Sequence, residues 1–151
     1  QIPATTAVNF EIKLFGFLPI GDAIVEEKGL TLFNDKKVYR IALIAKSKKI
    51  FSRLIQAELR INSYVDSESF LPIHYKEILK VSGKDERVKE ITYNQHRNTM
   101  IAEGKKVKIL PNTLDPLSAF NYVRQIDFNN VKYFDLNINS NQKNYIFNVD
   151  V

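Results

Sequence analysis

The chain lacks cysteine and tryptophan altogether, and it has one methionine and two histidines among 151 residues. Without cysteine it has no disulfide, no thiol nucleophile and no cysteine-ligated metal site. It has no apolar run of about 18 residues, which predicts that no helix spans a membrane. No signal peptide is visible; because the chain opens on Gln1 and not on Met, we expect that a signal has been removed.

What the chain does have is apolar and aromatic residues along its whole length. It is 44% hydrophobic, with 10 Phe and 7 Tyr. This is enough to bury a core, and the length fits one domain over 1–151. Many aromatic, Ile and Val residues favour strands. The net charge of +5 comes from 22 basic and 17 acidic side chains and favours acidic partners only weakly.

Alternating apolar and polar residues predict a series of short strands. In the first of them, Val8, Phe10, Ile12 and Leu14 point to one side. We expect turns at Gly29, 34–35, 66–69, 83–86, 104–106 and 140–143. The expected strands are 8–17, 23–26, 38–45, 56–64, 71–79, 88–94, 99–103, 133–139 and 145–151. Residues 50–55 fit both helix and strand spacing. About nine strands at hairpin spacing predict a curved antiparallel meander, a half-barrel or open barrel.

One helix interrupts the strands. Asp115 is a good N-cap, and Pro116 fits the first helical position, where no N–H is needed. Leu117, Phe120 and Val123 recur at helical spacing. A short amphipathic helix is not stable alone in water, so we expect 115–126 to cover the concave face of the sheet. The chain stops at Val151 within an apolar alternation, and we expect one or more further C-terminal strands.

The apolar surplus is the best functional hint. Side chains of the helix and of the inward strand faces are candidates to line a site for a lipid, an acyl chain or a hydrophobic peptide. Ordinary core filling explains them at least as well. The candidate lining residues are Phe10, Leu14, Tyr75, Leu117, Phe120, Val123, Phe134 and Phe147. Arg124, beside the apolar face of the helix, is a candidate ion-pair partner or ligand clamp, and a structural salt bridge is favoured.

No constellation of residues indicates catalysis or metal binding. His74 and His96 lack neighbours at ligand spacing, which favours surface or hydrogen-bonded histidines. Asp66 and Glu68 suit a turn, and capping explains Asp115, so a hydrolytic carboxylate set is disfavoured. The serines lack a G-x-S-x-G context; they are Ser63, Ser69 and Ser118. We therefore predict no enzyme, no metal and no cofactor.

Two lysine-rich clusters raise the possibility of nucleic-acid binding. They lie near aromatic residues, as in single-strand binding barrels. However, they fall in turns and at strand edges, where lysine also prevents edge-to-edge aggregation, and this interpretation is favoured. The clusters are Lys46, Lys48, Lys49 and Arg53, and Lys105, Lys106 and Lys108.

Several motifs in order resemble one known family. They are Ser63-Tyr64-Val65-Asp66, 71–75 (LPIHY), 91–94 (ITYN), and 110–124, from Leu110-Pro111 through Asp115-Pro116 to Arg124; the glycines of 15–21 match the first hairpin. Over residues 8–151 the chain resembles the exported bacterial family catalogued as a domain of unknown function, number three-one-zero-eight. The resemblance implies a periplasmic or otherwise exported protein, with a curved antiparallel sheet and a helix similar to the lipoprotein-carrier half-barrels. It implies no catalytic residues.

These observations predict a non-enzymatic binding protein of the cell envelope that holds a hydrophobic ligand or an envelope protein between helix and sheet. The first alternative is an interaction subunit of a larger envelope assembly that acts by pairing an edge strand. A nucleic-acid-binding barrel ranks third. A cavity under the helix would favour ligand binding, whereas a packed core with an open edge strand would favour assembly.

Overall fold

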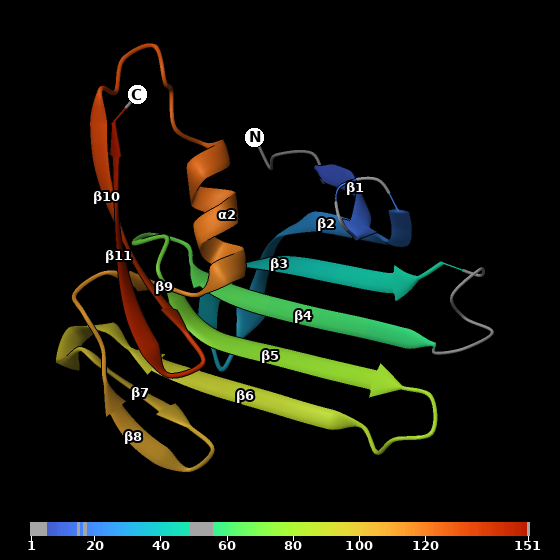
Figure 1. Cartoon of the computed structure of the whole chain (residues 1–151). Coiled ribbons are helices and arrows are strands. Elements are labelled where there is room, and N and C mark those ends of the chain that lie inside the picture. Colours follow the sequence, from blue (N-terminus) through green and yellow to red (C-terminus); the bar gives the residue numbers. More distant parts are fainter. Residues whose placement is uncertain (1–5, 15, 17, 49–55, 151) are drawn as a thin grey trace.

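The computed structural model describes residues 6–14, 16, 18–48 and 56–150. Its main part is an eight-stranded antiparallel sheet in which each strand lies beside the next strand along the chain (Figure 1). The strands are β1 (Ala7–Leu14), β2 (Leu18–Phe33), β3 (Lys36–Ser47), β4 (Ala57–Asp66), β5 (Pro72–Val81), β6 (Arg87–Asn94), β7 (Thr99–Ala102) and β8 (Lys105–Lys108). A 3-10 turn, η1 (Gln95–Arg97), joins β6 to β7. The predicted antiparallel meander is confirmed.

A second, smaller sheet follows. It consists of β9 (Thr113–Leu114), β10 (Tyr133–Ser140) and β11 (Lys143–Asp150), with β10 in the middle. The helix α2 (Pro116–Arg124) lies between β9 and β10 in the sequence. The β9–β10 pairing is parallel, and it was not predicted. A connection that contains a helix permits such a parallel pair, whereas tight turns permit only antiparallel ones.

The tight turns follow from residues that tolerate a positive φ. Asn34 and Asp35, between β2 and β3, have φ of 48° and 62°. Asn141 and Gln142, between β10 and β11, have φ of 50° and 63°. Two consecutive residues of this kind give the hairpin turn whose twist matches that of the strands. Both turns were predicted.

One other turn prediction was wrong, and a further one had the wrong bounds. Gly29, with φ of 76°, lies inside the 16-residue strand β2, where the register shifts between Glu27 and Leu30. The glycine therefore serves a bulge, which bends the strand without ending it. The turn expected at 104–106 is shorter, because Glu103 and Gly104 make it and β8 begins at Lys105.

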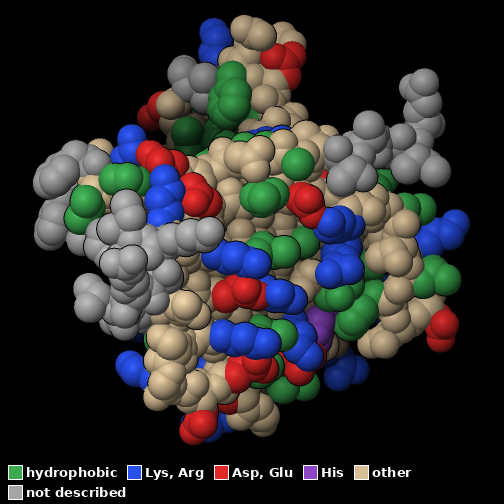
Figure 2. Space-filling model, turned by 90° about the vertical axis from the view of Figure 1, so that its right-hand side faces the viewer, with side chains coloured by type: hydrophobic (Ala, Val, Ile, Leu, Met, Phe, Trp, Pro, Cys, Tyr) green, Lys and Arg blue, Asp and Glu red, His purple; other side chains and the backbone are tan. Residues whose placement is uncertain are grey.

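The two faces of the large sheet differ in chemistry. On the inner face, Val25, Ile41 and Val65 form one buried cluster with Leu117 of the helix. On the outer face, opposite charges face each other across neighbouring strands, from Asp22 through Lys46 and Glu58 to Lys80. Figure 2 shows this outer face, where Lys and Arg side chains alternate with Asp and Glu. The cluster of buried apolar side chains that contacts the helix therefore lies on the inner face.

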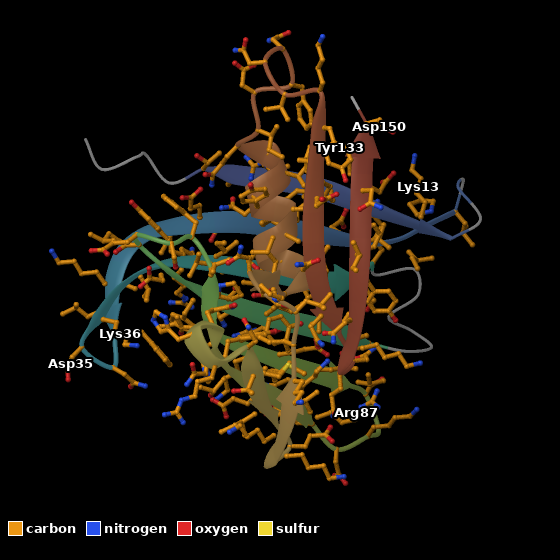
Figure 3. The ribbon with its side chains drawn as sticks, turned by 90° about the vertical axis from the view of Figure 1, so that its left-hand side faces the viewer. Lys13, Asp35, Lys36, Arg87, Tyr133 and Asp150 are labelled. Atoms are coloured by element: carbon orange, nitrogen blue, oxygen red, sulfur yellow. The ribbon has the colours of Figure 1, made fainter. Side chains whose placement is uncertain are left out.

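The helix and the β10–β11 hairpin lie together on the inner face. Figure 3 shows both in front of the large sheet, with Tyr133 and Asp150 near each other at the open end of the hairpin. Leu136 of β10 is buried against Leu114 and Ala119. The predicted helix over 115–126 is confirmed as a helix of 116–124 flanked by Asp115 and Gln125. In the described residues β1 and β8 do not pair, so the curved sheet does not close into a barrel.

Candidate functional site

The N-terminus of α2 carries a buried carboxyl group. The Asp115 side chain is fully buried, and its Oδ1 accepts hydrogen bonds from the backbone N–H groups of Leu117 and Ser118, both at 2.9 Å. In return, the backbone N–H of Asp115 donates a hydrogen bond of 3.0 Å to the Ser118 hydroxyl, which completes a capping box. On the other oxygen, Oδ2 accepts a hydrogen bond of 2.6 Å from the hydroxyl of Ser63. This last contact joins the helix to β4 of the large sheet.

The environment of Asp115 opposes its ionisation. Burial raises the pKa of this carboxyl above its usual value, because the charged form loses its hydration. The hydrogen bonds from Ser63, Ser118 and Leu117 favour the carboxylate and act in the opposite direction. The net effect is a raised pKa, because burial outweighs the hydrogen bonds.

Beside Asp115 lies a cavity of about 300 Å³, between the inner face of the large sheet and the β10–β11 hairpin. The cavity is lined by Ile61, Tyr75, Glu77, Lys89, Ile91, Tyr93, Asp115, Pro116, Asn139, Ser140 and Asn141. The tip of the hairpin is tied down on one side by a hydrogen bond of 2.9 Å from the Lys89 ammonium to the Asn141 side chain. Four strands, the tip of the hairpin and the start of the helix thus surround one mixed polar and apolar space.

Two buried polar atoms of residues in this wall have no hydrogen-bond partner among the described residues. They are the hydroxyl of Tyr93, a residue only 6% exposed, and the side-chain oxygen of Asn139, only 1% exposed. The amide nitrogen of Asn139 does have a partner, Asn144, at 2.8 Å. The Tyr75 hydroxyl donates to Glu77 at 2.7 Å. Burial raises the pKa of both tyrosines, so the Tyr93 hydroxyl keeps its proton and is both a donor and an acceptor.

The predicted apolar lining residues do not surround one common space. Of these residues, only Tyr75 lines the cavity beside Asp115. Leu117 is packed against the sheet, and Phe120 contacts the edge of Phe10 with the ring centroids 5.5 Å apart. Val123 and Phe134 flank the buried cluster around Leu136. Phe147 is 48% exposed on β11; Leu14 ends β1, and its side chain lies outside what the structure describes.

Under the helix the packing is tight. The hollow bounded by Ile41, Val65 and Ser118 has a volume of about 10 Å³, which is the size needed for one water molecule. An acyl chain has no space there. Arg124 is exposed, with its guanidinium carbon 5.7 Å from the centre of the Phe120 ring. We find no ion pair of Arg124 within the described residues, so the cation–π contact with Phe120 takes the place of the expected salt bridge.

The other candidate residues lie in turns or make packing and hydrogen-bond contacts within the fold. His74 is buried, stacks on Phe33 with centroids 4.8 Å apart, and lies 3.0 Å from a carboxylate oxygen of Glu90. Asp66 accepts hydrogen bonds from Ser69 in its turn, which lowers the pKa of Asp66. His96 lies in η1, and Ser69 and Glu68 lie in the 66–69 turn. In the part of the chain that the structure describes, no cluster of three or more potential metal ligands occurs.

The two lysine clusters differ in their surroundings. Lys46 pairs with Glu58 at 3.4 Å, and Lys48 pairs with Glu11 at 2.5 Å. Lys49 and Arg53 lie outside the described residues. The other cluster, Lys105, Lys106 and Lys108, occupies most of β8, the last strand of the large sheet. The expected position of these lysines at a strand edge is confirmed, and lysine at an edge disfavours edge-to-edge aggregation.

The edge formed by β11 carries no such lysines. β11 is the outer strand of the small sheet, and nearly all of its residues are exposed. Tyr145 and Phe147 are 43% and 48% exposed on one face, and Ile146 is 62% exposed on the other. Between Lys143 and Asp150 the strand carries no charge. Within the part of the chain that the structure describes, this edge therefore offers unpaired backbone groups flanked by apolar side chains.

Sequence reasoning identified Asp115 as a cap but missed its partners. Ser63 occupies an inward position between Ile61 and Val65 in the strand alternation, and an inward serine in an apolar row needs a buried partner. That signal was present in the sequence. For Tyr93 and Asn139 the sequence carried no such signal, because only the fold brings β6 and β10 close to the start of the helix.

The fold and the site define a class of protein: an open, curved antiparallel sheet whose inner face is covered by one helix and one hairpin. The chain belongs to the family described as "Protein of unknown function (DUF3108)", whose model matches residues 9–151. No curated protein and no solved structure matches the chain. No helix among the described residues is long and apolar enough to cross a membrane.

Proposed function

We propose that this protein is a non-enzymatic binding module of the cell envelope that captures an extended segment of another protein along β11. The observation that carries the proposal is the contrast between the sheet edges. β8 is protected by three lysines and β1 carries Glu11 and Lys13, whereas β11 has no charge between its end residues. An unpaired edge of this kind is a template for strand addition.

The partner segment follows from the side chains along β11. Backbone pairing requires an extended strand without proline at the paired positions. Tyr145 and Phe147 favour apolar or aromatic residues at alternate positions of that strand, on the face they share. Like β11 itself, the partner would be uncharged over about six residues. The envelope location rests on the family resemblance, which implies export.

A photo-crosslinking amino acid at position 146, introduced in the native host, tests the proposal. We expect one protein to be crosslinked through an uncharged, alternating segment in the envelope fraction. The substitution Phe147→Lys should abolish that crosslink. The matched control places the crosslinker at Leu32, a residue 69% exposed in the β2–β3 hairpin.

Three results would contradict the proposal. The first is an equal yield from positions 32 and 146. The second is a crosslink that survives Phe147→Lys. The third is amide protection along the outer side of β11 in the protein alone, because it would show that the protein's own chain covers the edge.

A hydrophobic ligand is the second candidate, favoured by the apolar side chains that remain exposed at the start of the chain. Phe10 and Ile12 of β1 are each 38% exposed on the face that β1 shares with the buried Ala23. The tight packing under α2 argues for a bound molecule outside the helix and not beneath it. Native mass spectrometry of protein purified from its own envelope separates the candidates. Co-purified lipid would support this one, and a stoichiometric protein the first.

A further inference from the structure

A second cavity, of about 330 Å³, lies between the β4–β5 turn, the helix and β10. It shares no lining residue with the cavity beside Asp115. β9 pairs with β10 only at Asn137 and Ile138, so the preceding residues of β10 have no partner strand on that side among the described residues. The shortness of β9 therefore leaves this space open along one side of β10.

Phe70 places an aromatic ring in the wall of this second cavity. Its φ of 57° lies in the left-handed region, which is unfavourable for a bulky side chain and is where glycine is usual. The ring is 45% exposed and stacks on Tyr39, with the centroids 5.8 Å apart and the planes 7° from parallel. The turn itself does not require a ring at this position. A strained, exposed residue beside a cavity points to a binding role.

Two more side chains of the wall are accessible to a bound molecule. Tyr122 of the helix is 43% exposed, and Asp135 of β10 is exposed as well. Asp135 is the one charged residue in the lining, and its carboxylate accepts a hydrogen bond from the Tyr133 hydroxyl. Within the described residues we find no ion pair of Asp135 and no cation over the ring of Phe70 or Tyr122.

The charge and the rings together select a cation. An anion in the cavity would meet the Asp135 carboxylate and no basic side chain of the lining. A cation is attracted both to the carboxylate and to the faces of aromatic rings. A primary ammonium group also has three N–H donors. Ser69 and Asn137 of the lining add oxygen acceptors; the Asn137 amide nitrogen already donates to the Pro111 carbonyl at 2.7 Å.

We infer that this cavity binds the ammonium group of a lysine side chain from a partner protein, with its methylene stem against the rings of Phe70 and Tyr122. Lysine stems commonly lie along apolar surfaces while the charged end stays in a polar environment. The volume of about 330 Å³ is at the lower end for binding sites, which suits one side chain. A lipid headgroup amine is disfavoured, because its phosphate would lie near Asp135. No residue of β11 lines the cavity, so the site is independent of strand capture at that edge.

Titration of the isotope-labelled protein with Nα-acetyl-lysine N-methylamide, followed by NMR, tests the inference. We expect saturable shifts of the side-chain amide signals of Asn112 and Asn137, with a dissociation constant of about 1 mM for a single side chain. Asp135→Asn keeps the shape and removes the charge, and it should weaken binding at least tenfold. The matched control is Asp150→Asn, an exposed carboxylate of the same hairpin outside the cavity, which should leave the affinity unchanged. Phe70→Gly should stay folded, because glycine adopts this φ without strain, and should also bind more weakly.

Several outcomes would overturn the inference. The absence of saturable shifts would do so, as would equal affinity in wild type and Asp135→Asn. Equal binding of the Nε-acetylated probe, which has no charge, would show that the ammonium group is not recognised. Tighter binding of phosphoethanolamine would assign the cavity to a lipid headgroup instead of a protein side chain. None of these measurements depends on whether β11 captures a protein segment.

Discussion

Asp115 is the residue on which several contacts converge. Its carboxyl group caps α2 through two backbone N–H groups and joins the helix to β4 through Ser63. We expect Asp115→Ala to lower the free energy of unfolding by roughly 2–4 kcal/mol. Loss of an N-cap costs about 0.5–2 kcal/mol, and a buried hydroxyl left without its partner costs about 1–3 kcal/mol. Urea denaturation measures the difference, and Asp85→Ala, in the exposed β5–β6 turn, is the control.

The same residue predicts a pH dependence with a defined sign. Burial raises the pKa of Asp115 in the folded protein above the ordinary value of 3.8, which applies to the unfolded chain. At pH values between the unfolded-state pKa and the folded-state pKa, the folded state therefore holds more protons than the unfolded state. The free energy of unfolding therefore falls as pH rises through this window, and the contribution is fully present only below it. Wild type should lose stability relative to Asp115→Asn as pH rises above about 4. A difference between the two proteins that stays constant with pH would contradict this account.

Ser63 supplies a second test of the same carboxyl group. Its hydrogen bond favours the Asp115 carboxylate, so Ser63→Ala should raise the pKa of Asp115 further. The pH window of destabilisation should then extend to higher pH. The carboxyl carbon shift of Asp115, followed by NMR during titration, reports this pKa directly. An unchanged or lower pKa of Asp115 in Ser63→Ala would show that the 2.6 Å hydrogen bond from Ser63 does not stabilise the carboxylate.

At the scale of elements, how much the sequence predicts depends on how local the signal is. The helix start was predicted because Asp115 and Pro116 act on the adjacent turn. The Asn34–Asp35 turn was predicted for the same reason. Gly29 was misread because a positive φ suits a bulge as well as a turn, and only the pairing of β2 with β3 distinguishes them.

Longer-range features gave no local signal. The parallel pair of β9 and β10 joins segments separated by the helix, and a two-residue strand has no periodicity to detect. The candidate site shows the same limit. Tyr93 and Asn139 lie 46 positions apart in the sequence, and alternation predicts which way each side chain points but not what lies opposite it.

Gly21 gives a prediction at the scale of the β2–β3 pair. A Cβ atom at this position would lie 2.8 Å from the backbone oxygen of Lys46, closer than such atoms approach in proteins. Gly21→Ala should therefore force β3 away and destabilise the fold by roughly 1–3 kcal/mol, as overpacking does. In Gly83→Ala, at a position with φ of 74° and no neighbour within 4 Å, only backbone strain is added. Equal stability of Gly21→Ala and wild type in denaturant would show that the strands separate freely here.

At the scale of the whole molecule, the two sheets are held together unequally. The large sheet is a continuous meander in which neighbouring strands pair throughout. The hairpin depends on the short parallel pair with β9, on packing of Leu136 against Leu114 and Ala119, and on polar contacts at its tip such as Lys89–Asn141. Regions with fewer buried contacts open at lower free energy than the rest. The hairpin is consequently the part of the protein best suited to rearrange when a partner or ligand binds.

Amide hydrogen exchange tests this hierarchy. We expect β3, β4 and β5 to exchange only through global unfolding, and β10 and β11 through a smaller opening of lower free energy. Along β11, alternate amides face away from β10 and should exchange almost as fast as in an unfolded chain, because no strand covers them within the described residues. Asn141→Ala should accelerate exchange in the hairpin without affecting β3–β5, since it removes the contact with Lys89. Uniform protection over both sheets would mean that the hairpin and the large sheet unfold as one unit, and a mobile hairpin could then play no part in capturing a segment.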